Sequence, residues 1–414
     1  MSQNYKYKYF QYYRDYYFFK KLDIDSLEKF KSELLDKELY HFYSFIITLL
    51  CRYCLDNNQH DKFFEYLAEL KNIAATHKGY SLLYSHINEG YYIFLSSKDL
   101  DKAIEHFKKA LKIYQENKFD NPHTLYTLYQ YMGVTYYKMS DDISAYDLLQ
   151  KALECDLNET FKFHKAMTYN WLAIIEDKHH FTAQALQKAL KSAHIYKRYS
   201  IENRYCDVLN TVGLLYLELK HFDNAISVFE ESIEIAKKTN QIIIIADAYN
   251  NLGMLYYEIK NYKLSEENYL QSLEYRPITD IKKTYYTLNN LGNTCREMAG
   301  YDKSEKYLLD SLHKAKPLQD DLFISQIYGN LAVMFLKKKE FDKALEYLKL
   351  SESLANNFQD TIQLKRIYQT YIDYYNQKED YQKTNQYWQL FTEKLQEDYE
   401  NKLDTTVKFI KGSE

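Results

Sequence analysis

The chain has 414 residues and a formal net charge of −4, with acidic and basic residues interspersed. This balance gives no general support for nucleic-acid binding, and no apolar run approaches the length of a membrane-spanning helix. Only three prolines and nine glycines occur, which favours helices with short connections over sheets joined by tight turns. Five scattered cysteines suit a reducing compartment, and the start lacks the apolar segment of a signal peptide, so we expect a cytoplasmic protein.

Residues 1–40 are expected to form an N-terminal helical hairpin. YFQYYRDYYFF (residues 9–19) and DSLEKFKSELL (residues 25–35) read as its two helices, with Asp25 or Ser26 as the N-cap of the second. YKYKYFQYYR (residues 5–14) interleaves basic and aromatic residues as single-strand binders do, but packing against the first repeat is the favoured interpretation. The region has neither Gly nor Ala, which the tight turn of a helix-turn-helix normally wants, so no direct DNA binding is expected.

Residues 41–395 repeat with a period of 40. With Gly253 as the anchor, steps of 40 reach Gly133, Ala173 and Gly213 upstream and, with a single one-residue slip, Gly292, Ala332 and Ile372 downstream; further upstream the rhythm reaches Tyr91 and Cys51. Twelve residues after each anchor the side chain is usually small, four later it is usually bulky, and three after that it is small again. This periodicity predicts stacked pairs of antiparallel helices, in which the small residues let the two helices approach closely.

The motif small–x–x–Tyr followed by Ala–x–x–x–Phe–x–x–Ala resembles tetratricopeptide repeats. The resemblance implies an all-α fold, a right-handed superhelical solenoid of about nine 40-residue hairpins, with longer helices than the usual 34-residue period allows. The prolines Pro122, Pro277 and Pro317 fall between repeats, after a second helix, where they break none. The expected domains are therefore residues 1–40, the solenoid 41–395, and a C-terminal helix extension and tail 396–414.

Side-chain amides recur three residues before the anchors. The series reads Asn88, Gln130, Asn170, Asn210, Asn250, Asn289, Gly329 (followed by Asn330) and Gln369. Asn costs a helix up to roughly 0.7 kcal/mol, which favours a compensating role. First helices line the concave surface of tetratricopeptide superhelices, so the resemblance implies a ladder of amides that grips the backbone of an extended peptide. The alternative is that each amide bridges adjacent helices and was copied by duplication.

Charged residues flank the amides. Asp207 and Asp247 precede Asn210 and Asn250 by one helical turn, and Arg366 precedes Gln369 in the same way. Arg296 and Asp177 lie four residues after their anchors and are also expected to face inward. This mixture suggests a mixed-charge or basic-ended peptide, although each of these residues is about as easily a solvated surface charge.

The remaining cysteine and histidine motifs are not expected to bind metal. Cys51 and Cys54 of the C-x-x-C fall on repeat packing positions, and His179–His180 falls in a turn that we expect to be solvated, so no metal site is predicted. We find no phosphate-binding loop, nucleophile elbow or convincing acid–base pair. The sequence therefore predicts no catalytic residues, no cofactor and no enzyme activity.

Two stretches, YSLLYSHINEGYYIFLSSKDLDKAIEHFKKAL (80–111) and LYTLYQYMGVTYYKMSDDISAYDLLQKALECD (125–156), resemble repeats of the Rap/NprR/PlcR/AimR group of quorum-sensing peptide receptors. The resemblance implies that a short peptide binds in the concave groove and changes the pitch of the superhelix. Asn170, Asn210, Asn250 and Asn289 are the closest matches to the family's peptide-holding asparagines. Phosphatase members carry a catalytic Gln in the N-terminal bundle; the comparable region, residues 46–56, has none.

We therefore expect a cytoplasmic regulator without a helix-turn-helix domain, which binds a short peptide and thereby changes its interaction with a regulatory protein partner. The alternative is a general scaffold that binds a partner protein's tail with no signalling peptide. A third interpretation, nucleic-acid binding through the Tyr/Lys-rich N-terminus, would show salt-sensitive binding. No membrane partner is expected, and the sequence leaves a homodimer open.

Overall fold

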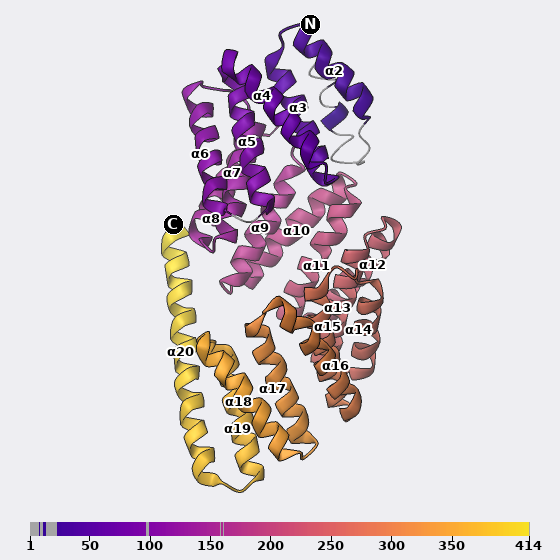
Figure 1. The fold of residues 1–414 in the computed structure, drawn as a ribbon, viewed down its shortest axis with the longest axis vertical. Coiled ribbons are helices and arrows are strands. Elements are labelled where there is room, and N and C mark those ends of the chain that lie inside the picture. The colour runs from indigo at the N-terminus through magenta and orange to yellow at the C-terminus, as the bar shows by residue number, and fades with distance from the viewer. Residues whose placement is uncertain are drawn as a thin grey trace. The chain divides into compact units, whose positions relative to one another are not determined.

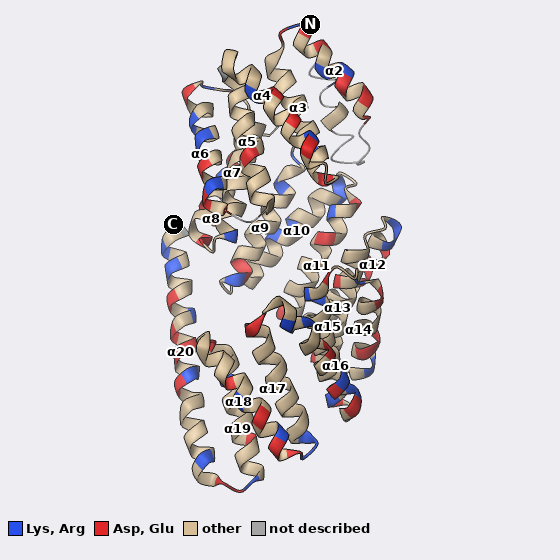
Figure 2. Ribbon diagram, viewed as in Figure 1, with Lys and Arg blue, Asp and Glu red and all other residues tan. Residues whose placement is uncertain are grey.

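The computed structural model describes residues 8, 11–13, 23–96, 99–157, 159 and 161–413. Within these ranges the chain is all-helical, with consecutive helices packed as hairpins (Figure 1). None of the described helices has both the length and the apolar character needed to cross a membrane. Lys, Arg, Asp and Glu are mixed along most of the helices (Figure 2).

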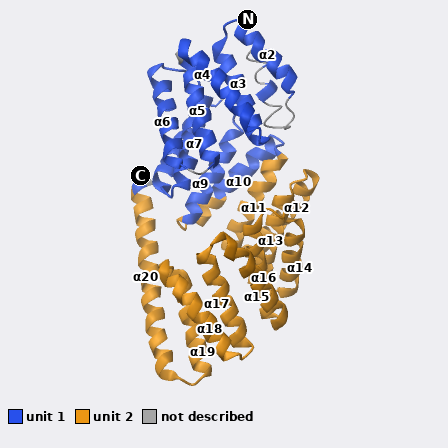
Figure 3. Cartoon of the chain, in the orientation of Figure 1, with its two compact units in different colours: residues 1–178, 187–201, 412–414 blue, residues 179–186, 202–411 orange. Residues whose placement is uncertain are grey.

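The chain divides into two compact units (Figure 3). The first contains residues 1–178, 187–201 and 412–414. Its helices are α2 (Ile24–Asp36), α3 (Tyr40–Asp56), α4 (His60–Thr76), α5 (Lys78–Ser96), α6 (Leu100–Glu116), α7 (Pro122–Lys138), α8 (Asp142–Glu154), α9 (His164–Lys178) and most of α10 (Thr182–Arg198).

The second unit contains residues 179–186 and 202–411. Its helices are α11 (Glu202–Glu218), α12 (Phe222–Lys238), α13 (Ile242–Glu258), α14 (Tyr262–Tyr275), α15 (Ile281–Glu297), α16 (Tyr301–Ala315), the 3-10 turn η1 (Lys316–Leu318), α17 (Asp321–Lys337), α18 (Phe341–Asn357), α19 (Thr361–Gln377) and α20 (Tyr381–Ser413). The C-terminal helix extension expected over residues 396–414 is continuous with the last helix, α20, which ends at Ser413.

The 40-residue period comes from pairs of helices whose starts lie 20 residues apart, as at Glu202, Phe222, Ile242 and Tyr262. Most of the described turns between helices contain a residue with positive φ, such as Lys220 (60°) and Lys260 (62°). This left-handed residue lets the chain reverse in three residues while the last helical carbonyls stay bonded. After α13, for example, the amide of Asn261 donates to the carbonyl oxygen of Tyr256 at 2.8 Å.

The predicted one-residue slip lies in the connection after α14. This helix ends at Tyr275 and α15 begins at Ile281, 19 residues after the start of α14. Pro277 occupies the connection, Pro122 is the first residue of α7, and Pro317 lies in η1. The prediction that all three prolines follow a second helix is confirmed.

Small anchor residues bring the two helices of a hairpin together, as the sequence predicted. A Cβ added to Gly253 would lie 2.7 Å from the ring of Tyr269 in α14, and one on Gly292 would lie 2.7 Å from Leu308 in α16. Twelve residues after Gly253, the hydroxyl of Ser265 donates to the carbonyl oxygen of Gly253 at 2.8 Å. The backbone of the first helix therefore lies directly against the side chains of the second.

The N-terminal expectations need two corrections. Most of residues 9–19, including the first expected helix, lies outside the described residues, but α2 is present and its N-cap is Asp23, not Asp25 or Ser26. The carboxylate of Asp23 accepts from the amide of Ser26 at 3.1 Å. Tyr13 is buried against Phe161 and its hydroxyl lies 3.0 Å from Nε2 of His123, so this residue of the 5–14 stretch packs on α7 and on the segment before α9, beyond the first repeat.

The cysteines of the C-x-x-C pack as expected, but one of the two adjacent histidines does not lie where it was expected. Cys51 and Cys54 are buried, and burial raises the pKa of both thiols. His180 is exposed in the turn between α9 and α10, as expected. His179 is not solvated: it is buried, with its ring stacked on Phe409 of α20 at 3.9 Å between centroids.

Candidate functional site

The first helices of consecutive hairpins contact one another within each unit. In the second unit α11 contacts α13, α13 contacts α15, α15 contacts α17 and α17 contacts α19; in the first unit the same holds for α3, α5, α7 and α9. Among the described helices, second helices do not pack on one another to a comparable extent. A stack curves toward the side on which its elements lie closer, so the first helices form the inner surface of each unit.

Several ladder amides bond between neighbouring first helices. The side-chain oxygen of Asn250 in α13 accepts from the hydroxyl of Thr287 in α15 at 3.0 Å. The side-chain oxygen of Asn289 in α15 accepts from the amide of Asn330 in α17 at 2.8 Å. In the first unit, the amide of Asn88 in α5 donates to the hydroxyl of Thr48 in α3 at 3.0 Å. Bridging between helices, the alternative role that the sequence left open, is therefore present at these positions.

The ladder positions differ in how far they open to solvent. Asn88, Gln130, Asn210 and Asn289 are buried, whereas Asn170, Asn250 and Gln369 are half-buried. The side-chain oxygens of Asn88, Asn170 and Asn210 have no hydrogen-bond partner among the described residues. An unsatisfied buried acceptor costs about 1–3 kcal/mol, so these three amides are not explained by internal bonding alone.

Asn250 combines a fixed orientation with an available donor. Thr287 holds its side-chain oxygen, which directs the NH₂ group away from α15. This nitrogen lies 3.7 Å from the sulfur of the exposed residue Met254. Because a thioether is a weak acceptor, the two N–H donors of Asn250 are available to a stronger one.

A second row of side chains lies one helical turn before the ladder, six residues before each anchor. In the second unit it runs through consecutive first helices as Asp207, Asp247, Tyr286, Gln326 and Arg366. Both end members, Asp207 and Arg366, are exposed, and the three between them are half-buried. The sequence pointed to the acidic and basic members; Tyr286 and Gln326 were missed, although the same 40-residue step reaches them.

Asp207 is exposed, yet its surroundings disfavour its charge. Loss of hydration raises the pKa of its carboxyl, and Asp247 on the next first helix raises it further, while Arg204 and Lys283 oppose the shift. Asp247 is itself paired: Nη1 of Arg276 lies 2.6 Å from one oxygen, and Lys283 bonds the other. A surface carboxyl with a raised pKa is a candidate binding residue, and a cation is the group that would favour its ionised form.

Arg296 does not face an open surface. It is buried, with Nη1 donating to the side-chain oxygen of Asn293 at 2.8 Å and Nε donating to Glu297 at 3.1 Å. Asp177 is half-buried on α9. Arg296 thus stabilises the end of α15 instead of presenting a charge.

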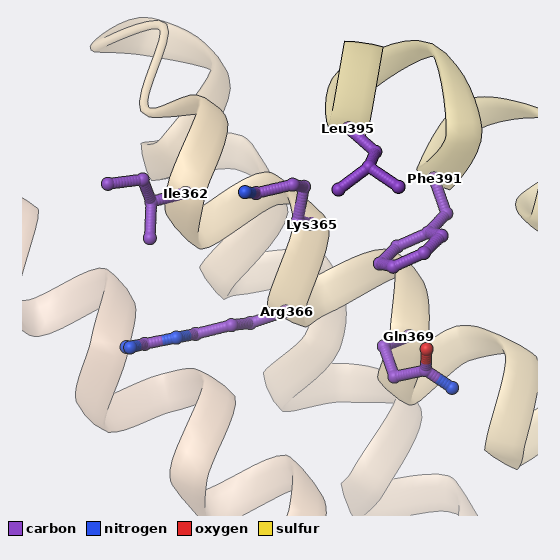
Figure 4. Close-up of a pocket in the computed structure, with 6 residues that line it drawn as sticks. All are labelled: Ile362, Lys365, Arg366, Gln369, Phe391 and Leu395. Atoms are coloured by element: carbon purple, nitrogen blue, oxygen red, sulfur yellow. The ribbon is translucent and has the colours of Figure 1, made fainter. Parts of the chain in front are cut away.

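A cavity of about 440 Å³ lies at the C-terminal end of the second row (Figure 4). α19 contributes Ile362, Lys365, Arg366 and Gln369, and α20 contributes Phe391 and Leu395. Lys365 pairs with Asp398, so the exposed guanidinium of Arg366 supplies the cationic character of the cavity. The lining combines apolar side chains with a guanidinium and a carboxamide, groups that suit a ligand carrying both an apolar side chain and a carboxylate.

Comparison with known proteins agrees with the repeat. The tetratricopeptide repeat family profile matches residues 84–117, 207–239, 246–279 and 325–358. No curated protein matches the sequence. The chain thus contains tetratricopeptide repeats, and it has the fold of the Rap proteins and of the quorum sensor NprR.

Three solved structures illustrate the likeness. The apo form of RapI superposes with a TM-score of 0.69 at 16% identity, over 86% of this chain and 98% of that one. The Rap conjugation regulator of plasmid pLS20, in complex with the Phr* peptide, gives 0.53 at 12% identity over 80% and 97%. Aspartyl phosphate phosphatase F from Bacillus subtilis gives 0.55 at 14% identity over 84% and 93%. The fold thus serves both a peptide-bound regulator and a phosphatase, so it does not choose between these roles.

Proposed function

We propose that this protein is a cytoplasmic regulator that binds a short extended peptide along the first helices and thereby changes its interaction with a protein partner. The observation that carries the proposal is Asn250, whose oxygen is held by Thr287 and whose N–H donors have only a weak acceptor. Half-buried Gln369 supplies a further amide at an equivalent position of the same unit, and half-buried Asn170 offers the same group in the first unit. An extended peptide presents carbonyl oxygens and N–H groups at regular intervals, which such amides pair with.

The second row supports a peptide of mixed charge. A basic group would relieve the desolvated carboxylate of Asp207 at one end of the row. A carboxylate beside an apolar side chain would suit Arg366, Phe391 and Leu395 at the other end. The Phr* peptide bound to the pLS20 Rap regulator provides a precedent for a peptide ligand on this fold.

A bound peptide could regulate the protein because it would bond to amides that also connect neighbouring first helices. The amides of Asn250 and Asn289 already connect consecutive first helices. A ligand that binds one arrangement of these helices more tightly than another shifts the population toward it, by no more than its difference in affinity. A partner surface elsewhere on the solenoid would then be altered without direct contact. We propose no phosphatase activity, because α3 contains no Gln.

The test is a screen of the full-length protein against short synthetic peptides, with binding followed by fluorescence polarisation. Peptides with a basic residue toward one end and a carboxylate beside an apolar residue toward the other should bind. Asn250→Ala and Asp207→Ala should weaken that binding while far-UV circular dichroism is unchanged. Asn268→Ala is the matched control, because Asn268 lies on the second helix α14.

Two outcomes would overturn the proposal. One is that no free peptide binds and only the tail of a partner protein does, which is the behaviour of a general scaffold. The other is a hit whose affinity falls in Asn268→Ala but not in Asn250→Ala. That result would place the ligand on the outer cavity lined by Tyr249, Leu264 and Asn268.

A further inference from the structure

Two histidines and a glutamate from one hairpin of the first unit converge on a single point. His86 and Glu89 lie three residues apart on one face of α5, and His106 lies on the facing helix α6. One candidate ligand atom from each lies within 4.8 Å of the other two, and all three residues are half-buried. The sequence did not reveal this group, because its members belong to two helices and to no short metal-binding motif.

We propose that His86, Glu89 and His106 bind a divalent transition-metal ion, with zinc the best match. Imidazole and carboxylate are ligands that zinc accepts, and three protein ligands leave one position for water or another group. Such an ion would connect α5 to α6 inside a hairpin. The proposed metal site does not use the amide position of the peptide groove, which in α5 is Asn88.

The separations fit a tetrahedral ion. Nδ1 of His86 lies 3.2 Å from Nδ1 of His106, and the latter lies 3.6 Å from Oε2 of Glu89. Zinc–ligand bonds of about 2.0–2.2 Å at tetrahedral angles place ligand atoms about 3.3–3.5 Å apart. The third separation, between the ligand atoms of His86 and Glu89, is at most 4.8 Å, so side-chain shifts of up to about one ångström would complete the geometry.

The packing of the hairpin holds the ligands in place. A Cβ on Gly90 would lie 2.7 Å from the ring of Phe107 and 3.2 Å from Cβ of His106, so the α5 backbone lies directly on α6 beside the cluster. Lys71 of α4 bonds Oε1 of Glu89 and leaves Oε2 toward His106. A partner on the second oxygen orients a ligating carboxylate, as outer groups do in metal sites.

The competing explanation is a hydrogen bond between two neutral imidazoles. The 3.2 Å approach of the two Nδ1 atoms also suits one N–H donating to the other nitrogen. That arrangement needs no carboxylate nearby and no ion. The two explanations differ in whether the full-length protein takes up metal, and in whether Glu89 matters for uptake.

The experiment uses the full-length protein, stripped with a chelator and freed of any purification tag. Zn²⁺ binding is measured by isothermal titration calorimetry, and Co²⁺ is used for the visible absorption of a tetrahedral site. We expect one ion per chain, a higher melting temperature with Zn²⁺, and affinity at least about tenfold weaker in His106→Gln and Glu89→Gln. His194→Gln, at an exposed histidine of α10, should bind as the unmodified protein does.

Glu89→Gln guards against a folding defect, because this nearly isosteric change removes a ligand without altering the histidine contact. Absence of Zn²⁺ binding to the unmodified protein would overturn the proposal. Unchanged stoichiometry and affinity in a folded His106→Gln or Glu89→Gln variant would overturn it as well. Co²⁺ spectra typical of octahedral coordination would exclude the tetrahedral site.

Discussion

The hydroxyl of Ser272 in α14 donates a 2.7 Å hydrogen bond to the main-chain carbonyl oxygen of Ala246 in α13. Equivalent bonds, also 2.7 Å long, connect other second helices to the first helices of their own hairpins: Ser232 to Cys206, Ser311 to Tyr285 and Ser351 to Ser325. The serine at this repeat position is therefore both small and a hydrogen-bond donor. Its hydroxyl binds the second lone pair of a main-chain carbonyl oxygen in the first helix.

Ser272→Ala should lower the free energy of unfolding by about 1 kcal/mol, the net worth of a typical buried hydrogen bond. The control is Ser192→Ala at the equivalent position of α10, where the buried hydroxyl has no partner among the described residues. That change should be neutral or stabilising. Urea unfolding of both variants, followed by circular dichroism, makes the comparison; equal losses would show that the bond contributes nothing.

Left-handed residues in the turns offer a route to greater stability. Lys260 has φ of 62° and is exposed, and the left-handed conformation costs a non-glycine residue roughly 1–2 kcal/mol. Lys260→Gly should therefore raise the melting temperature, despite the greater freedom of glycine in the unfolded chain. Lys349→Gly, at an exposed position in the middle of α18, should instead destabilise by about 1 kcal/mol. A drop in melting temperature for both variants would contradict the argument.

Gly253→Ala sets helix propensity against packing. Alanine favours the interior of α13 by about 1 kcal/mol, but its Cβ would meet the Tyr269 ring at 2.7 Å, and overpacking typically costs about 1–3 kcal/mol. We expect a net loss of stability, measured by thermal unfolding. Gly300→Ala is the control, since its nearest contact is the carbonyl oxygen of Cys295 at 3.3 Å and its loss should be smaller.

The repeat made the fold predictable. Small residues at a constant spacing pack one helix on another in the same way in every repeat, so the period predicted the helical hairpins. The one-residue slip in the period corresponds to the connection after α14. The N-cap of α2 was misplaced by two or three residues because Asp23, Asp25 and Ser26 are all acceptable caps. Propensity alone does not choose among neighbouring caps; the packing of Leu27 and Phe30 does.

The site was less predictable, for a geometric reason. Sequence spacing gives the face of a helix, but not what the neighbouring helix places against it, so the bond from Thr287 to Asn250 and the burial of Asn289 were invisible. Arg296, which was expected to face inward, is buried and bonded to Asn293 and Glu297 near the end of α15, which its spacing did not reveal. The His86–His106 pair was within reach, because His106 precedes the Phe107 that packs on Gly90.

Asp207 should make the stability of the fold depend on pH, and the direction of this effect follows from its pKa. Its folded-state pKa is raised above the ordinary value of 3.8, mainly by lost hydration and then by Asp247. Ionised Asp207 therefore lowers the stability of the fold at neutral pH, and this penalty disappears as the pH falls below the unfolded-state value. Asp207→Asn should thus raise the melting temperature at neutral pH, and the difference from the unmodified protein should shrink toward pH 3.8.

Asp247→Asn provides the contrast, because it removes the partner of Arg276 and Lys283 and should destabilise the protein at neutral pH. Thermal melts across the acidic range separate the two variants, and a constant benefit of Asp207→Asn at every pH would rule out charge as its cause. Asp207→Asn should also weaken the binding of a peptide that carries a basic group. A residue that costs stability in the free protein and adds affinity in the complex is best explained as a binding residue, since packing alone would favour the amide.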